Sequence, residues 1–419
     1  MRILTISHLY PSEVDDTAGT FVHRQVCALR ERGHDVRVIS PIPWAPPGVP
    51  RYAAHRQVPR CTRIDGVPVL HPRMFVLPGA KLGPGIVHSA LRAIDGHVRR
   101  TYRDWPFDLV HAHMLVPDGW AAASAGHAVG VPVIATAHGS ADVLQTPGRS
   151  PAWRRTVIES ITEIDQIIAV SNAVARGVCD LARPRHGVRV IPNGADPAHF
   201  GTVDRAGARH ALGLPTDRRV ALFVGHLTEL KGIADVIDAL GTAEARAERP
   251  FLAIVGDGPL RPTLEARVAA LGLGDSVRFA GRVTHDDVGI WMGACDVLVL
   301  PSLSEGLPTV ICEAMLAGRA VIATPVGGTP ELVEDGATGI LVPVGNVPAL
   351  ADALGALLGD PGRTDAMGER AALRARATLT WTAVAQQIEA VYREVLVRRH
   401  TTLPDTDPAG DNIPHIAVP

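Results

Sequence analysis

Short apolar runs alternate with longer amphipathic segments along almost the whole chain. The clearest amphipathic segment places Ile233, Val236, Ile237 and Leu240 on one face of a helix. Most of the short runs are apolar throughout, as in parallel strands that are covered on both faces. The strands predicted in this way lie at 2–6, 36–40, 108–111, 132–136, 167–170 and 188–191, and then at 220–224, 252–255, 277–279, 296–300, 320–323 and 340–342. The repetition of strand, helix and strand predicts an α/β protein with doubly wound layers.

The two sets of strands predict two Rossmann-like domains. We place the boundary near 194–216, where Gly, Pro and Asp cluster before a new strand begins. Residues 41–84 interrupt the pattern, because a group of prolines opens a segment that is predicted to be a long irregular loop. Residues 381–398 have the pattern of a helix, and the Pro- and Asp-rich tail that follows is predicted to be disordered.

The composition is that of an ordinary globular protein, with 46% hydrophobic and 20% charged residues among 419 and a net charge of −2. This excludes a wholly disordered chain and argues against binding of nucleic acid through bulk positive charge. The cysteines include no C-x-x-C pair and predict neither a disulfide framework nor a zinc site. The N-terminal strand lacks the features of a signal peptide, and the uncharged stretch 119–141 is rich in Ala and Gly. We therefore expect a cytoplasmic protein without a transmembrane helix.

Charge is divided unevenly along the chain. Residues 1–200 carry a net charge of +6 and the remainder carries −8, which indicates different partners for the two halves. Residues 88–103 place Leu91, Ile94 and Val98 on one helical stripe beside several arginines. One interpretation is peripheral contact of this basic half with an anionic membrane surface, where a lipid-linked acceptor would lie. The other, which we favour, is an ordinary amphipathic helix packed on its own sheet.

The strongest chemical signal follows the strand at 296–300. A loop that contains Glu305 leads to a helix that starts at about Thr309 and contains Glu313. The free amides and the positive dipole end of such a helix form an anion site that suits a phosphate. Carboxylates accept hydrogen bonds from sugar hydroxyls, so a pair that flanks this site fits a compound of sugar, diphosphate and ribose. Two solvated glutamates at a helix start are the alternative interpretation.

A second loop, 225–232, follows the strand at 220–224, at the edge of the sheet where ligands of open α/β folds bind. It contains Lys231, and only two of the 41 basic residues are lysines. A cation near the start of a helix is slightly unfavourable, whereas a lysine there is able to neutralise a diphosphate. An ordinary surface lysine is the alternative.

These two loops resemble those of the retaining glycosyltransferases of family 4, which have the GT-B fold. The resemblance rests on Glu305 to Glu313 in the pattern S-x-x-E-G-x-P-x-x-x-x-E-A-M, and on Lys231 in G-x-L-x-x-x-K-G. Shorter matches run along residues 1–398 and are Ala18-Gly19-Thr20-Phe21, His111-Ala-His113, Thr136-Ala-His138-Gly139-Ser140-Ala141-Asp142, Ser171-Asn172, Asn193-Gly194, Gly256-Asp257-Gly258, Gly281-Arg282 and Gly327-Gly328-Thr329-Pro330-Glu331. Each short motif is weak alone, but their order along the chain is specific.

The resemblance implies two Rossmann-like domains that face a central cleft. Residues 1–195, with a returning helix at 379–398, would bind the acceptor, residues 196–378 would bind the nucleotide-sugar donor, and 399–419 would form the tail. The catalytic roles fall to His138 near the anomeric centre, Lys231 at the diphosphate and Glu305 by the donor sugar. The donor-binding roles fall to Gly19, His226, Arg282, Gly306, Leu307, Pro308, Thr309 and Glu313, and the acceptor side holds His111, His113 and Asp142. Plain packing is the alternative for His111 and His113.

The implied activity is transfer of a hexose-type sugar from a nucleoside diphosphate to a hydroxyl acceptor in polysaccharide, glycolipid or glycoside biosynthesis. UDP-sugar is the expected donor and GDP-sugar the alternative. Lys231 and the helix amides would stabilise the departing diphosphate, whose oxygen takes the acceptor's proton on the front face. No metal or other cofactor is expected, because the sequence has no D-x-D at a strand end and no histidine cluster with ligand spacing.

One position departs from the family pattern. The family usually has Arg where this chain has His226, so a permanent bidentate cation is replaced by an imidazole that is only partly charged near neutrality. Two other functions therefore stay open. One is another GT-B enzyme such as a sugar-nucleotide 2-epimerase, against which the Glu305 and Glu313 pair argues. The other is a non-catalytic sugar-nucleotide-binding protein, which only His226 supports.

Overall fold

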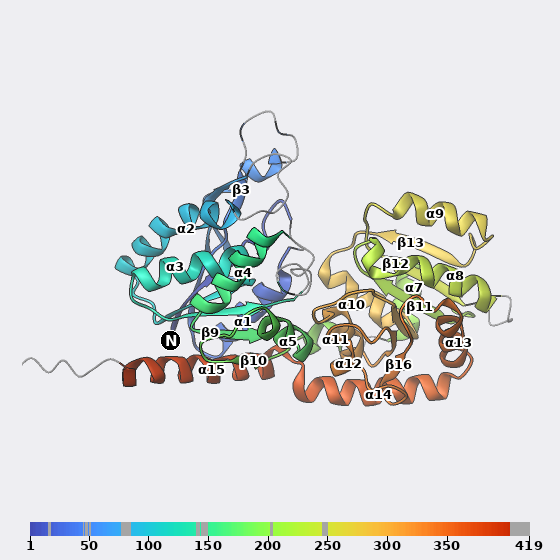
Figure 1. Ribbon diagram of the computed structural model, residues 1–419. Coiled ribbons are helices and arrows are strands. Elements are labelled where there is room, and N and C mark those ends of the chain that lie inside the picture. The colour runs from blue at the N-terminus through green and yellow to red at the C-terminus, as the bar shows by residue number, and fades with distance from the viewer. Residues whose placement is uncertain are drawn as a thin grey trace, which may run out of the picture.

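The structure is a computed structural model that describes residues 1–15, 18–44, 46, 49, 52–76, 85–139, 143, 150–201, 204–244 and 250–402. Two largely parallel sheets with helices packed against them divide these residues between two domains (Figure 1). The prediction of an α/β protein with two Rossmann-like domains is confirmed.

The first sheet contains eight strands. They are β1 (Arg2–Ile6), β2 (Asp35–Ile39), β4 (Cys61–Ile64), β5 (Val67–Leu70), β7 (Leu109–His113), β8 (Val133–Ala137), β9 (Gln166–Ala169) and β10 (Val188–Val190). Their order is β10-β9-β8-β7-β1-β2-β5-β4, and only β4 runs antiparallel to its neighbour. The six strands predicted for this half are all present, with ends that differ from the prediction by two residues or fewer.

The second sheet is entirely parallel. Its strands are β11 (Val220–Val224), β12 (Phe251–Val255), β13 (Val277–Gly281), β14 (Val297–Leu300), β15 (Ala320–Ala323) and β16 (Gly339–Leu341). The order is β13-β12-β11-β14-β15-β16, so β11 and β14 lie next to each other in the centre. The loops after these two central strands therefore start side by side, and they are the two loops that carry Lys231 and Glu305.

Helices cover the faces of both sheets (Figure 1). The first domain has α1 (Thr20–Glu31), α2 (Gly85–Asp104), α3 (Trp120–Ala128), α4 (Pro151–Glu163) and α5 (Asn172–Leu181). The following helices are α6 (Pro197–Phe200), α7 (Arg205–Leu212), α8 (Ile233–Glu244), α9 (Arg261–Ala270), α10 (His285–Ala294), α11 (Thr309–Leu316), α12 (Thr329–Leu332), α13 (Val347–Leu358), α14 (Pro361–Thr378) and α15 (Trp381–Thr402). The apolar stripe predicted from Ile233 to Leu240 lies on α8 and is buried.

The prediction of a long irregular loop at 41–84 is wrong for much of that segment. It contains β4, β5 and a separate parallel pair, β3 (Ile42–Trp44) with β6 (Arg73–Phe75). β4 and β5 form a hairpin through Asp65 and Gly66, whose φ angles of 46° and 75° suit a tight hairpin turn. The Asp-Gly pair was the available signal, but prolines and strands of three or four residues hid the alternation on which strand prediction depends.

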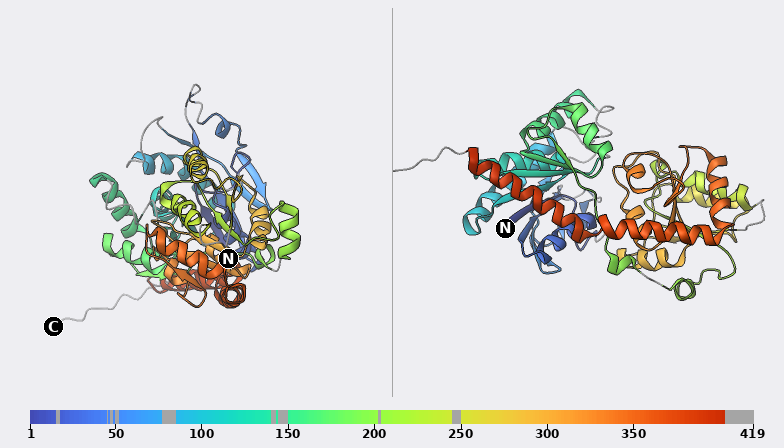
Figure 2. Two further views of the ribbon diagram at one scale, coloured as in Figure 1. Left: turned by 90° about the vertical axis from the view of Figure 1, so that its right-hand side faces the viewer. Right: turned by 90° about the horizontal axis from the view of Figure 1, so that it is seen from below.

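The chain passes between the domains twice, and the two crossings are hydrogen-bonded to each other. Ala195 N donates to Leu379 O over 2.8 Å, and Trp381 N donates back to Ala195 O over 3.3 Å. Beyond this point α15 packs on α1, and its Trp381 and Tyr392 belong to the core on that side of the first sheet. Figure 2 shows α14 along the second domain and α15 along the first.

The helical prediction for 381–398 is confirmed, but the helix continues to Thr402. Residues 399–402 are therefore helical rather than part of a disordered tail. The first proline after Trp381 is Pro404, so no proline ends the helix earlier. Arg and His side chains are compatible with the last turn of a helix. The rest of the predicted tail, 403–419, lies outside the described residues.

The apolar face of α2 packs on its own domain, as the second interpretation of the basic segment expects, and membrane contact through the basic face stays a prediction. Val87, Ala90, Ile94 and Val98 are at most 1% exposed and belong to the core. The arginines on the outer face of α2 are exposed. Among the helices that the structure describes, none combines the length and the apolarity that a bilayer span requires.

We expect a methyl group at Gly194 to loosen the crossing between the domains. A Cβ there would lie 2.8 Å from Trp381 Cδ2 and 2.9 Å from Trp381 N, so Gly194→Ala should destabilise the protein by about 1–3 kcal/mol. Gly96→Ala on the exposed face of α2 is the matched control, because a Cβ there meets nothing within 4 Å. It should raise the melting temperature slightly. Equal melting temperatures for both variants would contradict the packing at Gly194.

Candidate active site

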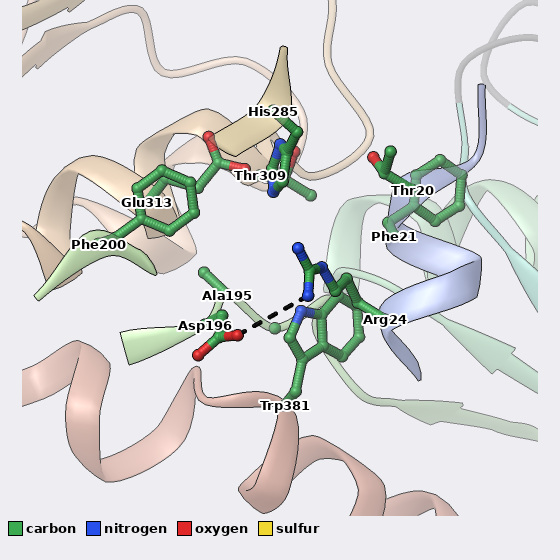
Figure 3. Close-up of a pocket in the computed structure, with 11 residues that line it drawn as sticks. Thr20, Phe21, Arg24, Ala195, Asp196, Phe200, His285, Thr309, Glu313 and Trp381 are labelled. Atoms are coloured by element: carbon green, nitrogen blue, oxygen red, sulfur yellow. Dashed lines mark ion pairs between the residues drawn. The ribbon is translucent and has the colours of Figure 1, made fainter. Parts of the chain in front are cut away.

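A pocket lies between the two domains (Figure 3). From the first domain, α1 contributes Thr20, Phe21 and Arg24, and from the second, α11 contributes Thr309 and Glu313. The remaining lining residues belong to the crossing segments and to α6 and α10, and they are Gly194, Ala195, Asp196, Phe200, His285 and Trp381. One cavity is thus shaped by segments from both domains and from the C-terminal helix.

The first turn of α11 meets this pocket without a side-chain cap. The helix begins at Thr309 after Pro308, and no side chain makes a capping hydrogen bond. Ile311 N donates to the Pro308 carbonyl over 3.1 Å, which leaves the amides of Thr309 and Val310 available to an anion. Glu313, about one turn further, is 9% exposed, and burial raises the pKa of its carboxyl to about 7. An anion site and a carboxyl that is half protonated near neutrality thus lie on the same helix.

Lys231 and Glu305 form an ion pair between the two loops that follow β11 and β14. Lys231 Nζ donates to Glu305 Oε1 over 2.6 Å, and the Ser302 hydroxyl donates to the same oxygen over 2.6 Å. Because Glu305 is only 7% exposed, these donors take the place of water at its carboxylate. The sequence placed both residues at the donor, and the structure adds that they are direct partners.

The loop that carries Glu305 touches the first domain through its backbone. A Cβ on Gly306 would stand 2.0 Å from the His138 carbonyl oxygen, and one on Gly139 would stand 3.1 Å from Gly306 Cα. The Ser171 hydroxyl donates to the Gly306 carbonyl over 3.0 Å. Glycine is required at 306 because any side chain would separate the two backbones. Leu307, next in the loop, is buried beside this contact.

A second cross-domain contact involves two of the short motifs. The Glu331 carboxylate accepts from the backbone N of Asn172 over 2.8 Å and from Asn172 Nδ2 over 2.8 Å. Glu331 therefore caps the first turn of α5, a helix of the other domain, where a negative charge is favourable. Sequence reasoning placed both motifs in the family pattern without connecting them.

Three histidines at the ends of β7 and β8 form a stack. The ring centroids of His111 and His113 are 4.6 Å apart, and those of His113 and His138 are 5.4 Å apart. His111 and His113 are 0% and 1% exposed, which supports packing rather than direct contact with an acceptor. Burial lowers the pKa of His111 and of His138 to about 3, so both imidazoles are neutral at physiological pH.

Of the predicted site residues, Thr309 and Glu313 line the pocket, whereas Gly19, His226 and Arg282 are not among its lining residues. Gly19 is the N-cap of α1 with φ of 64°, and a Cβ there would lie 2.1 Å from Leu9 O, so the glycine loop needs this residue. His226 is exposed in the loop after β11, and Arg282 is exposed directly after β13. Asp142 lies outside the described residues.

Sequence reasoning missed Arg24, which reaches from α1 toward the second domain. Its Nη2 lies 3.5 Å from Asp286 Oδ1 and its Nη1 lies 4.0 Å from Asp196 Oδ2 (Figure 3). Burial and the nearby charge of Arg24 lower the pKa of His285, which lines the same pocket. The available signal was the position of Arg24, one turn into the helix that follows the glycine loop.

Within the described part of the chain, one group has ligand atoms close enough to hold a metal ion. It consists of His23, Cys27 and Asp65, whose ligand atoms lie within 4.8 Å of one another. Hydrogen bonds account for this arrangement, since the hydroxyl of Tyr10 lies 2.7 Å from His23 Nδ1 and Asp65 Oδ2 lies 2.8 Å from His23 Nε2. The sequence analysis did not find this group, although His23 and Cys27 stand one helical turn apart.

Both halves of the chain match known glycosyltransferase families. The family described as Glycosyltransferase Family 4 matches residues 18–199, and the family described as Glycosyl transferases group 1 matches residues 204–374. The chain therefore belongs to glycosyltransferase family 4 and has the GT-B fold.

Relatives match over most of the chain. The teichuronic acid biosynthesis glycosyltransferase TuaC of Bacillus subtilis is 33% identical over 79% of this chain and 83% of its own. The D-inositol 3-phosphate glycosyltransferase of Kineococcus radiotolerans is 32% identical over 91% of each. The crystal structure of Anabaena HepE in complex with UDP-glucose matches with a TM-score of 0.72 and 23% identity, over 94% of this chain and 100% of that one.

We expect the affinity for a nucleoside diphosphate to rise with pH through the titration of Glu313. A ribose hydroxyl donates best to the ionised carboxylate, and with a pKa of about 7 the ionised fraction grows about tenfold between about pH 6 and about pH 8. Calorimetric titration with UDP and with GDP at both pH values measures the change.

The control for this titration is Glu313→Gln, which removes the carboxyl. The phosphates of the nucleotide titrate in the same way with both proteins. Affinities that change equally with pH in both proteins would exclude Glu313 as the cause.

The same raised pKa affects the stability of the free protein in the opposite sense. The folded state holds the proton more tightly than the unfolded chain, so stability falls as the pH rises through about 7.

Proposed function

We propose that this protein is a retaining glycosyltransferase that transfers a sugar from a nucleoside diphosphate to a hydroxyl acceptor. The observation that carries the proposal is the pocket between the domains, where the uncapped first turn of α11 and the buried Glu313 lie together. The Lys231 and Glu305 pair follows from the neighbouring strand ends. These groups supply an anion site, a cation and two acceptors for sugar hydroxyls within two neighbouring loops and one helix.

The donor is proposed to lie along α11 and the two loops. Glu313 would accept hydrogen bonds from the ribose hydroxyls, and the amides near Thr309 would bind a phosphate. Lys231 would share its charge between Glu305 and the diphosphate. Amides at Gly19 and the backbone near Arg282 would contact the diphosphate and the base, respectively.

The proposed reaction separates charge, and this arrangement stabilises the charges where they develop. Breaking the bond between the anomeric carbon and the phosphate oxygen places negative charge on the diphosphate, which Lys231 and the α11 amides stabilise. The acceptor oxygen then bonds to the anomeric carbon from the same face and loses its proton to the departing phosphate oxygen. His138 would contact the sugar from the first domain. A neutral imidazole there adds no positive charge next to an anomeric carbon that itself becomes positive.

We propose UDP as the nucleotide, with GDP as the alternative, and transfer without a metal or other cofactor. The support for UDP is the complex of HepE with UDP-glucose, a protein of the same fold. We propose transfer to a polysaccharide, a glycolipid or a small glycoside, because the relatives are named for teichuronic acid biosynthesis and for inositol 3-phosphate. A cytoplasmic setting is a separate part of the proposal.

Peripheral contact with a membrane is a separate proposal that only the exposed arginines support. They lie on α2, whose apolar face is already covered by its own domain. Such contact would be electrostatic and would weaken with salt. Flotation with anionic vesicles at low and at high salt measures it, and absence of binding at low salt would end this proposal.

Two other functions fit less of the site. A sugar-nucleotide 2-epimerase would use the same nucleotide pocket, and release of the epimer of the donor sugar would identify it. A non-catalytic sugar-nucleotide-binding protein rests on His226 in place of arginine. It predicts nucleotide binding without transfer or hydrolysis.

The first experiment is a thermal-shift panel with UDP, GDP, ADP and their common sugar conjugates. A ligand that binds only the folded protein at about a hundredfold its dissociation constant adds about 2.7 kcal/mol of stability and raises the melting temperature. We expect UDP and UDP-sugars to give the largest shift. A larger shift with GDP would identify GDP rather than UDP as the nucleotide. No shift with any nucleotide at millimolar concentration would contradict the proposed donor site.

Loss of the Lys231 cation should abolish transfer without abolishing the fold. We expect Lys231→Ala to lower turnover at least about a hundredfold, the usual effect of removing a donor that stabilises a developing anion. Ser302→Ala is the matched control, because it removes the other hydrogen bond to Glu305 Oε1 and leaves the cation. Similar losses in both variants would mean that Lys231 acts only by supporting Glu305.

A further inference from the structure

A continuous set of hydrogen bonds links the C-terminal helix to His138 through the interior of the first domain. The Tyr392 hydroxyl lies 2.5 Å from His111 Nδ1. Gln25 Nε2, from α1, lies 3.4 Å from His111 Nδ1 and 3.4 Å from His113 Nε2. His113 Nδ1 lies 3.1 Å from His138 Nε2. Of these residues, His111, His113, Gln25 and Tyr392 are buried, so the network is shielded from water.

The positions of the ring protons in this network follow from the amide nitrogen of Gln25, which can donate hydrogen bonds but cannot accept them. The amide nitrogen of Gln25 has no lone pair to offer, so it donates and His113 Nε2 accepts. A neutral imidazole carries one proton, and that of His113 must therefore lie on Nδ1, which donates to His138 Nε2. His138 in turn carries its proton on Nδ1. Burial lowers the pKa of each of these histidines, which keeps the rings neutral.

The same rule accounts for His111 without conflict. The single lone pair of its Nδ1 accepts from the Tyr392 hydroxyl at 2.5 Å, with Gln25 Nε2 a more distant contact at 3.4 Å, so its proton lies on Nε2, which donates to Thr136 Oγ1 over 2.8 Å. The three rings therefore have one consistent proton arrangement. Among the described residues, the network ends at the Nδ1–H of His138, whose backbone carbonyl lies at the contact with the second domain.

That last nitrogen is a buried polar atom without a hydrogen-bond partner among the described residues. The His138 ring contacts Phe21, a residue that lines the pocket, with centroids 4.6 Å apart. Its carbonyl oxygen faces Gly306 of the donor-side loop. A buried donor with no partner is costly, and a ligand oxygen in the cleft would remove that cost.

We propose that Gln25 and His113 are positioning residues that fix His138 in its Nδ1–H tautomer, so that His138 donates a hydrogen bond to an oxygen of the sugar nucleotide. This inference rests on the proposed function for the identity of the ligand, but the tautomer is a property of the free protein. Neither Gln25 nor His113 touches the substrate. Each acts through the proton that it assigns to the next ring.

The tautomer can be read directly by NMR of protein labelled with ¹⁵N at histidine, because the two ring nitrogens give different shifts with and without a proton. The His138 signals are identified by their loss in His138→Gln. We expect the proton of His113 and of His138 on Nδ1 in the free protein. A proton on Nε2 of His138 would overturn the inference, whatever the protein's activity.

Two substitutions at one position separate proton assignment from packing. Asparagine at 113 can place its amide nitrogen where His113 Nδ1 stands, whereas phenylalanine fills the space of the ring without a donor. We expect His113→Asn to retain the Nδ1–H tautomer of His138. His113→Phe should lose it and lower kcat/KM for UDP-glucose hydrolysis about tenfold relative to His113→Asn, as for loss of one hydrogen bond. Equal tautomers and equal kcat/KM in the two variants would contradict the proposal.

Gln25→Leu provides a second, independent variant at the start of the network. It removes the donor to His113 Nε2, and we expect His113 and His138 to populate both tautomers. An unchanged tautomer would show that Gln25 does not set it. If the tautomers behave as expected but the wild type neither binds nor hydrolyses UDP-glucose, the proposed function fails while the tautomer assignment stands.

Discussion

The contact between the backbones of Gly306 and His138 is the constraint on which the rest of the cleft depends. A Cβ at position 306 would overlap the His138 carbonyl oxygen at 2.0 Å, so only glycine lets the donor-side loop rest on the first domain. Glu305 immediately precedes this contact and α11 begins three residues after it. This glycine, together with the Ser171 and Glu331 hydrogen bonds, therefore sets the distance from the histidines to both carboxyl groups. Because this backbone contact positions the loop, the side chains around the cleft do not have to hold the two domains at this point.

The two domains bring opposite kinds of electrostatics to this contact. The first presents neutral imidazoles, since desolvation holds the pKa values of His111 and His138 at about 3, and it also places in the pocket Arg24, which pairs with Asp286 and Asp196. The second presents a cation, a carboxylate and the free amides of a helix start. On the proposed function, negative charge develops on the diphosphate beside the second domain and positive charge develops on the sugar between them. The neutral imidazole of His138 on the sugar side and the positive groups on the phosphate side match that separation.

The sequence was sufficient wherever one element carried the whole signal. Buried parallel strands are continuous apolar runs, so they could be placed to within two residues, and the uncapped start of α11 follows from Pro308 and the apolar positions after it. Features built from several elements could not be predicted. The bond between His113 and His138 depends on the register that pairs His113 with Thr136, two residues before His138. The bond between His111 and Tyr392 depends on where α15 packs, 281 positions later. Arg24 likewise gains its partners only when α10 and the start of α6 approach α1.

The pairing of Lys231 with Glu305 changes the meaning of His226 in place of arginine. Because the lysine already compensates a buried carboxylate, it cannot give its whole charge to a diphosphate without leaving Glu305 uncompensated. The amides of α11 then become the permanent positive end of the site, and they carry only a partial charge. An arginine at 226 would add a permanent guanidinium able to bind two phosphate oxygens at once, whereas the exposed imidazole of His226 lacks that paired-donor geometry. On the proposed function, this chain therefore stabilises the departing diphosphate through the α11 amides and the shared charge of Lys231.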